Sequence, residues 1–186
     1  AVTAWDGQTG RLLWTQKRPG EPLVLRQPGV ILAVGDTLVV GLSGRLVGLN
    51  PSSGSVRWEA PVASPRGVND VERLVDLVGR ADRQGDVVCA RAFQASVGCV
   101  NAARGALLWT QSANGAQGVS SDDLQVYGTE SDGKVIAWRR ANGQRAWTSE
   151  RLMYRGLSGP VTLGSALAVG DSAGFVHFLS TGNGAL

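Results

Sequence analysis

The sequence predicts an all-β protein, a β-propeller built from four-stranded antiparallel blades. Three observations support this prediction: one short phrase is repeated five times, the repeats are evenly spaced, and the composition is rich in glycine and poor in charge. Hydrophobic residues make up 43% of the 186 residues and charged residues 18%, and there are 26 glycines. Short Val- and Leu-rich runs separated by glycine favour strands joined by tight turns over helices.

The repeated phrase is a short apolar run, a four-residue turn that ends in glycine, and a second short run closed by tryptophan. Its clearest copy spans residues 97–111, with the sequence VGCVNAARGALLWTQ. The turn glycines are Gly10, Gly54, Gly105, Gly143 and Gly184. They follow one another at steps of 44, 51, 38 and 41 residues. Such periods are typical of propellers, in which each repeat is one four-stranded blade.

Four strands can be counted within a repeat. Residues 30–34 and 37–41 flank a Gly-Asp turn, and a Ser-Gly turn then leads to the run that begins at Leu46. Glycine favours such hairpin turns because it tolerates a positive φ. Strands are named A to D from the propeller axis outward. The predicted domain is a partial propeller over residues 1–186, with strands C and D of one blade in 1–16, whole blades in 30–60, 81–111 and 119–149, and an incomplete blade in 160–186.

About four blades are therefore present, roughly half of an eight-bladed ring, since propellers contain about four to eight blades. An open half-ring would expose apolar blade faces at both ends. We expect those faces to be covered, either by the rest of a larger propeller or by self-association of two copies.

The tryptophan that closes each outer strand is predicted to be structural. A large flat side chain at a fixed place fills the widening gap between adjacent blades near the rim. These residues are Trp14, Trp58, Trp109 and Trp147. Trp5 and Trp138 lie in strand C of their repeats, and we expect them to fill core as well.

Catalytic, cofactor and metal chemistry find little support in the sequence. The single histidine, His177, lies in an alternating strand-like run and is expected to be half-buried or at the surface. No His or Cys spacing is typical of a zinc site, and the carboxylates are scattered over turns. The net charge of +3 is small and dispersed, which argues against a nucleic-acid partner. No apolar run approaches the roughly 20 residues that cross a bilayer. We expect no enzymatic activity and no cofactor.

The two cysteines lie in strands B and C of one predicted hairpin. With a two-residue turn at 94–95, Cys89 would face Val100. By the same register Cys99 would face Ala90, so the two thiols would point to opposite faces of the sheet. We therefore expect no disulfide, although a β-bulge in this hairpin would bring the thiols together.

Two long connections between blades lie next to each other on one face of the predicted propeller, and long loops of this kind commonly carry function. The first, about residues 17–29, contains Pro-Leu-Val-Leu-Arg at 22–26. In the second, about residues 60–81, Asn69 and Glu72 have capping-box spacing, and apolar residues recur at helical spacing up to Val78. A short helix is predicted at 69–78. The second connection either packs its apolar side onto the blades or forms a partner-binding patch with a charged rim.

Five short segments together resemble the BamB family. They are Pro-Leu-Val-Leu-Arg at 22–26, Val-Glu-Arg-Leu-Val-Asp at 71–76, Leu-Ser-Gly-Pro-Val at 157–161, Val-Gly-Asp-Ser at 169–172, and Gly174. The repeats alone are similar to PQQ-like propellers in general. The BamB proteins are propeller lipoproteins of the bacterial outer-membrane β-barrel assembly (BAM) machinery. The resemblance implies an eight-bladed, non-catalytic propeller at the periplasmic face of the outer membrane, held by a lipid anchor that lies outside this chain.

The resemblance also implies a partner. In the family, a Leu-x-Leu-Arg run and an Asp-x-Asp run bind the periplasmic POTRA domains of BamA, the barrel-inserting subunit, and other BAM subunits are reached indirectly. The first run maps onto residues 23–26. The second maps onto Asp76 alone, because Val78 stands where the second Asp would be. With two neighbouring charges added, the candidate partner-binding residues are Leu23, Leu25, Arg26, Glu72, Arg73 and Asp76.

Two other functions share the repeat. One is a propeller scaffold for another periplasmic partner. The other is a quinone-dependent dehydrogenase, whose family resemblance would imply a cofactor held on the axis, a disulfide between adjacent cysteines and a calcium site. Cys89 and Cys99 are not adjacent in the sequence, and no matching acidic cluster is recognisable, which argues against the dehydrogenase.

Overall fold

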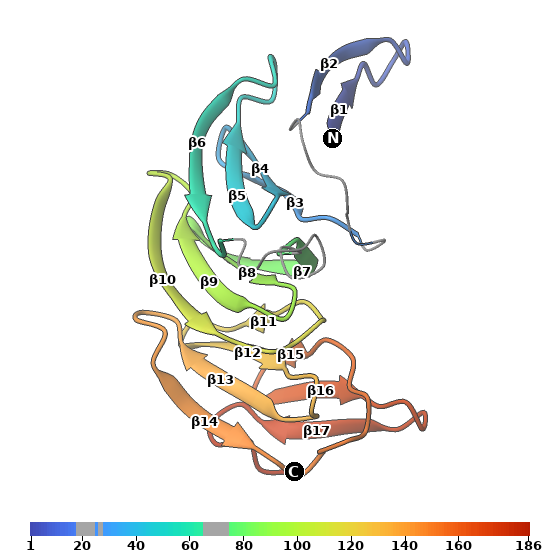
Figure 1. Ribbon diagram of the computed structural model, residues 1–186, viewed down its shortest axis with the longest axis vertical. Helices are drawn as coiled ribbons and strands as arrows, with labels where there is room; N and C mark the ends of the chain where they lie inside the picture. Colours follow the sequence, from blue (N-terminus) through green and yellow to red (C-terminus); the bar gives the residue numbers. More distant parts are fainter. Residues whose placement is uncertain (18–24, 26–27, 65–74) are drawn as a thin grey trace.

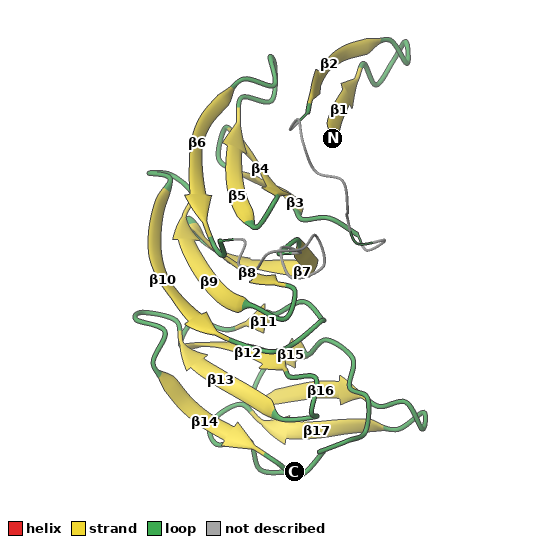
Figure 2. Cartoon of the chain, in the orientation of Figure 1, coloured by secondary structure: helices red, strands yellow, loops and turns green. Residues whose placement is uncertain are grey.

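The computed structural model describes residues 1–17, 25, 28–64 and 75–186. These ranges form seventeen β-strands, and none of their residues lies in a helix (Figure 2). The strands form one two-stranded hairpin, three four-stranded sheets and one three-stranded sheet, each an antiparallel meander in chain order. The prediction of an all-β fold with four-stranded antiparallel blades is therefore confirmed.

The strand bounds define the five sheets. The first hairpin is β1 (Val2–Trp5) and β2 (Leu12–Gln16). Blade 1 is β3 (Ile31–Val34), β4 (Thr37–Leu42), β5 (Arg45–Leu49) and β6 (Val56–Pro61). Blade 2 is β7 (Leu77–Gln84), β8 (Val87–Ala92), β9 (Ser96–Asn101) and β10 (Ala106–Ser112). Blade 3 is β11 (Ser120–Ser121), β12 (Gln125–Thr129), β13 (Val135–Arg139) and β14 (Arg145–Ser149). Blade 4 is β15 (Val161–Leu163), β16 (Ala166–Gly170) and β17 (Val176–Ser180).

Successive sheets follow one another along an arc, with β6, β10 and β14 on its convex side (Figure 1). The buried apolar residues form separate clusters between neighbouring sheets. Val39 and Leu46 of blade 1 join Val88 and Val100 of blade 2 in one such cluster. Equivalent clusters lie between blades 2 and 3, between blades 3 and 4, and between the first hairpin and blade 1. Each blade is therefore stabilised by burying its faces against its neighbours.

The repeated tryptophan of one blade packs on the repeated turn glycine of the next blade. The Trp109 indole Nε1 donates a 2.7 Å hydrogen bond to the carbonyl oxygen of Arg140. A Cβ added at Gly143 would lie 2.6 Å from the Trp109 ring, so only glycine fits in this turn. Trp147 makes the same contacts, with a 2.9 Å bond to the Thr181 carbonyl and its ring against Gly184. The tryptophan of one copy of the phrase thus meets the turn glycine of the next copy between adjacent blades.

The same contact occurs at the two earlier junctions. Trp14 donates a 2.9 Å hydrogen bond to the carbonyl of Pro51 and packs on Gly54. The Trp58 ring lies against Gly105, where an added Cβ would be only 2.4 Å from the ring. The predicted structural role of the outer-strand tryptophans is confirmed.

The two strand-C tryptophans differ from each other. Trp138 is 1% exposed and fills the cluster between blades 2 and 3, as expected. Trp5 is 61% exposed, so the prediction that it fills core is wrong for this residue. A bulge lies at both residues, so it does not explain the difference. Trp138 packs against residues of blade 2, the sheet that precedes its own, whereas no sheet precedes the β1–β2 hairpin among the described residues.

The prediction of a helix at 69–78 is wrong at its C-terminal end. Residues 65–74 lie outside the described ranges, whereas Leu77 and Val78 belong to β7, which begins four residues before the predicted start of this blade at 81. Both side chains are buried, at 6% and 1% exposure. A run of Leu and Val fits a buried strand as well as a helix, and here the contact with blade 1 decides for the strand.

Candidate partner-binding surface

A hydrogen bond joins the two connections that the sequence singled out. The backbone N–H of Leu25 donates to Oδ2 of Asp76 at 2.9 Å, across 51 residues of sequence. Leu25 and Asp76 are both half-buried. The fold therefore brings the Leu-x-Leu-Arg connection and the Asp76 connection together, although each belongs to a different junction between blades.

Asp76 is fixed by its own backbone and by its neighbours. Its carbonyl oxygen accepts a 2.9 Å hydrogen bond from the N–H of Phe93, in the turn between β8 and β9. Val75 and Leu77, on either side, are 7% and 6% exposed. Asp76 thus sits at the entry to β7 with both flanking side chains buried, and its carboxylate has a defined position.

An open cavity of about 450 Å³ lies beside this hydrogen bond. It is lined by the first hairpin, by the start of β3, by the end of β4 and by the start of β7, as well as by the two connections. Val2, Leu25, Ile31, Leu42 and Asp76 are among the lining residues. Ile31 is 62% exposed although it is a large aliphatic side chain. The arrangement is a hollow lined by apolar and polar groups in similar proportion, with one carboxylate among them, which suits a protein partner.

The other candidate residues lie outside the described ranges. These are Leu23, Arg26, Glu72 and Arg73. Val78, which stands where the family has a second Asp, is 1% exposed within β7. Its side chain therefore contributes to the blade and not to the surface.

Strand β7, which begins beside Asp76, pairs with a strand that contains one member of a buried ion pair. The sequence did not predict this pair. Arg91, opposite Val78 in the β7–β8 register, is 0% exposed. Its Nη1 lies 2.9 Å from Oε1 of Glu130 in blade 3, and its guanidinium is stacked 5.9 Å from the centre of the Trp138 ring. The second carboxylate oxygen of Glu130 accepts the backbone N–H of Asn114. One charged pair thus links blade 2, blade 3 and the connection between them.

The electrostatics of this pair follow from its burial. Removal from water lowers the pKa of Arg91, and the adjacent Glu130 carboxylate opposes that shift. One feature of the sequence indicates a buried charge: Arg91 interrupts the otherwise apolar run Val-Val-Cys-Ala-Arg-Ala at 87–92. A charged residue in such a run requires a partner that is distant in sequence.

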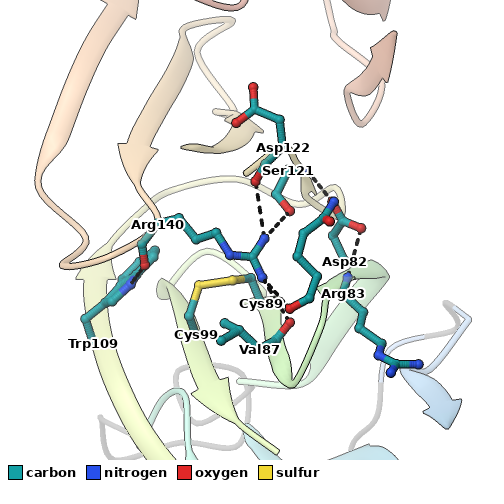
Figure 3. Close-up of a disulfide and its surroundings, with 10 residues drawn as sticks. Asp82, Arg83, Val87, Cys89, Cys99, Trp109, Ser121, Asp122 and Arg140 are labelled. Atoms are coloured by element: carbon teal, nitrogen blue, oxygen red, sulfur yellow. Dashed lines mark hydrogen bonds between the residues drawn. A yellow bond between two sulfur atoms is a disulfide. The ribbon is translucent and has the colours of Figure 1, made fainter. Parts of the chain in front are cut away.

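On the opposite face, Arg140 connects the same two blades. Its guanidinium donates to the carbonyl oxygens of Gln84 and Val87 in blade 2, at 3.0 and 3.2 Å, and to the Ser121 hydroxyl at 3.0 Å (Figure 3). The Asp82 carboxylate accepts the backbone N–H of Ser121. Burial lowers the pKa of Arg140, and nearby aspartates oppose the shift. The junction of blades 2 and 3 is held by an arginine at each face.

A disulfide lies in this junction, so the expectation of two free thiols is wrong. Cys89 and Cys99 are bonded to each other and are both 0% exposed (Figure 3). The turn has three residues, 93–95, and not two, because Ala92 pairs with Ser96. Gln94 adopts φ +48°, which makes this turn possible. The longer turn shifts the register by one, so that Cys89 pairs directly with Cys99 on one face of the sheet.

Comparison with known proteins places the chain in a family. The model of a family described as "Outer membrane protein assembly factor BamB" matches residues 1–149. The chain belongs to the BamB family. Outer membrane protein assembly factor BamB of Bordetella pertussis is 36% identical over 187 residues, covering all of this chain and 48% of that protein. The chain spans about half the length of the curated BamB relatives it matches.

Solved structures agree with this placement. The crystal structure of BamB from Moraxella catarrhalis matches with a TM-score of 0.85 at 26% identity, over 93% of this chain and 53% of that chain. Quinohemoprotein alcohol dehydrogenase from Comamonas testosteroni matches with a TM-score of 0.69 at 14% identity, over 98% of this chain and 38% of that chain. The second likeness shows only that this chain shares a fold with that enzyme.

Three further observations complete the description of this BamB-family chain. His177 is 18% exposed in its side chain and lies 2.8 Å from the Asp171 carboxylate, in the half-buried strand position that was expected. In the described ranges, no three His, Cys, Asp or Glu side chains gather as metal ligands would. The same ranges contain no helix long and apolar enough to cross a membrane.

Proposed function

We propose that this chain is a non-catalytic scaffold of the outer-membrane protein assembly machinery. In this function it binds the periplasmic POTRA domains of BamA and so supports the folding and insertion of β-barrel proteins. The binding surface consists of Leu23, Leu25, Arg26, Glu72, Arg73 and Asp76. Other BAM subunits are reached through BamA.

One observation supports this proposal above the others. The hydrogen bond from the Leu25 N–H to the Asp76 carboxylate brings together the two segments that resemble the BamA-binding runs of the family. Beside them lies a hollow lined by both apolar and polar groups, and burial of apolar side chains with a polar or charged rim is the usual composition of a protein interface. In the proposed complex, Leu23 and Leu25 are buried against the partner while Arg26 forms a directed charged hydrogen bond.

The proposed location is the periplasmic face of the outer membrane, with a lipid anchor outside this chain. The Cys89–Cys99 disulfide supports an oxidising compartment, because disulfides persist in the periplasm and are rare in the cytosol.

The test is a double substitution in the full-length protein. Leu23→Ala with Arg26→Ala is expected to weaken POTRA binding by about thirtyfold or more, since truncation of a central anchor commonly costs about 2 kcal/mol. Calorimetric titration measures the affinity, and thermal unfolding checks that the propeller remains folded. Unchanged affinity in a well-folded double mutant would remove these residues from the interface.

A matched control is available on the other face of the propeller. Leu124 is 74% exposed and Arg139 is exposed, both in blade 3. Leu124→Ala with Arg139→Ala removes the same two side-chain types and is expected to leave POTRA affinity unchanged. A comparable loss in this control would show that the effect is not specific to the proposed surface.

A further inference from the structure

The carboxylate of Asp76 has a partner inside its own chain. Its Oδ2 accepts the Leu25 N–H at 2.9 Å, while its own backbone carbonyl is held by Phe93. The acceptor is thus anchored on blade 2, and the donor belongs to the connection that leads into blade 1. A carboxylate in this position orients a backbone segment that has no strand pairing of its own at residue 25.

We infer that Asp76 is a positioning residue, which acts on the partner by holding the Leu25 segment and not by pairing its charge with a charge of the partner. This inference rests on the proposed function, in which residues 23–26 contact BamA. A hydrogen bond between a carboxylate and an N–H is stronger than one between neutral groups, and it fixes the peptide plane at Leu25. A segment ordered before binding loses less conformational entropy in the complex.

The residue two positions later supports this inference. Val78 occupies the place of the second family Asp, is 1% exposed and packs within β7. The segment therefore presents no pair of acidic side chains to a partner. A positioning role needs only one acceptor at Asp76, and that acceptor is already engaged with Leu25.

Two substitutions separate the two roles. Asp76→Asn keeps a side-chain oxygen that can accept the Leu25 N–H but removes the charge. Asp76→Leu has similar size and removes the acceptor. Titration of the full-length variants with the POTRA domains is expected to show rescue by the conservative change: binding by Asp76→Asn stays within about threefold of the wild type, while Asp76→Leu loses about tenfold or more.

Salt dependence gives a readout that a positioning role does not change. The wild type and Asp76→Asn are expected to show the same dependence of affinity on ionic strength, because the charge does not face the partner. If Asp76→Asn binds as weakly as Asp76→Leu and its salt dependence is flatter than that of the wild type, Asp76 pairs directly with the partner and the inference is wrong.

Amide hydrogen exchange of the unbound protein tests the inference without BamA. The Leu25 amide is expected to exchange faster in Asp76→Leu than in the wild type, with Asp76→Asn close to the wild type. Asp123→Leu, an exposed carboxylate between β11 and β12, is the matched control and leaves this amide unchanged. Equal Leu25 exchange in all variants would overturn the positioning role. Absence of POTRA binding in the wild type would overturn the proposed function alone.

Discussion

At the scale of single residues, the most consequential feature is a charge inside the core. Arg91 is fully buried between blades 2 and 3 and is neutralised by Glu130 at 2.9 Å. Gly115 and Gly128 leave room for the guanidinium, because an added Cβ would lie 2.1 Å from Nη1 at Gly115 and 2.2 Å from Nη2 at Gly128. The ion pair, the Trp138 ring and these glycines therefore form one packing unit next to the Asp76 entry of β7.

Removal of one partner of this pair is expected to be costly. Arg91→Ala leaves the Glu130 carboxylate buried without its counter-charge, which typically lowers the free energy of unfolding by about 3–5 kcal/mol. Urea unfolding followed by circular dichroism measures the loss. Arg139→Ala, at an exposed arginine that ends β13 of blade 3, is the control and is expected to stay within about 0.5 kcal/mol of the wild type. A loss below about 1 kcal/mol for Arg91→Ala would mean that the pair is not a main stabilising contact.

At the scale of the element, one contact repeats through the structure: the outer strand of each sheet packs on the glycine-containing turn of the following sheet. Trp109 in the middle of β10 needs Gly143 in the turn after β13, and the same contact joins the other blades. The sequence shows the tryptophan and the glycine in a single phrase, which suggests that they act within one hairpin. In the structure each tryptophan acts on the following copy of the phrase.

Substitution of the turn glycine tests this contact. Gly143 has φ +73° and lies against Trp109, whereas Gly35 has φ +57° with no atom within 4 Å of an added Cβ. Gly35→Ala is expected to cost only the backbone strain, about 1 kcal/mol. Gly143→Ala adds the clash with the indole, a further loss of about 1–3 kcal/mol. Thermal or urea unfolding of the two variants gives the comparison, and equal losses would contradict a packing role for Gly143.

At the scale of the whole molecule, the blades form an arc whose stability depends on the junctions between them (Figure 1). The junction of blades 2 and 3 contains the two buried arginines and a disulfide that closes a sequence separation of 10. Because both sulfur atoms are buried in this junction, a reductant reaches them only after the blades separate. The disulfide is thus protected by the fold that it stabilises.

Loss of the disulfide is expected to weaken the whole propeller. Cys89→Ala with Cys99→Ala should lower the free energy of unfolding by about 2–3 kcal/mol, the value expected for a loop of about ten residues. Denaturant unfolding measures the change, with the oxidised and reduced wild-type proteins as references. In the oxidised folded protein, thiol alkylation should require both reductant and denaturant. Rapid reduction under native conditions would contradict the burial of this bond.

Much of the fold was predictable because its signals are local. The turn glycines at positive φ, the Gly-Asp hairpins and the apolar runs each indicate their own hairpin, and their period indicates blades. The beginning of β7 was not predictable, since its Leu-Val run suits a helix and a strand equally well. In the candidate site, the hydrogen bond between Leu25 and Asp76 agrees with the expected adjacency of the two connections. The ion pair of Arg91 and Glu130 was not identified, because these two residues are 39 positions apart in the sequence.

The sequence by itself determined the class of the fold, the number and order of the strands around each repeated turn, and the family that the chain resembles. Tertiary structure decided which tryptophan meets which glycine, which face each cysteine occupies, and what the Asp76 carboxylate binds. The physical reason is that residue type and spacing constrain each hairpin locally. Register and contact between blades depend instead on turn length and on packing over tens of residues, so that a single extra residue at 93–95 moved Cys89 opposite Cys99.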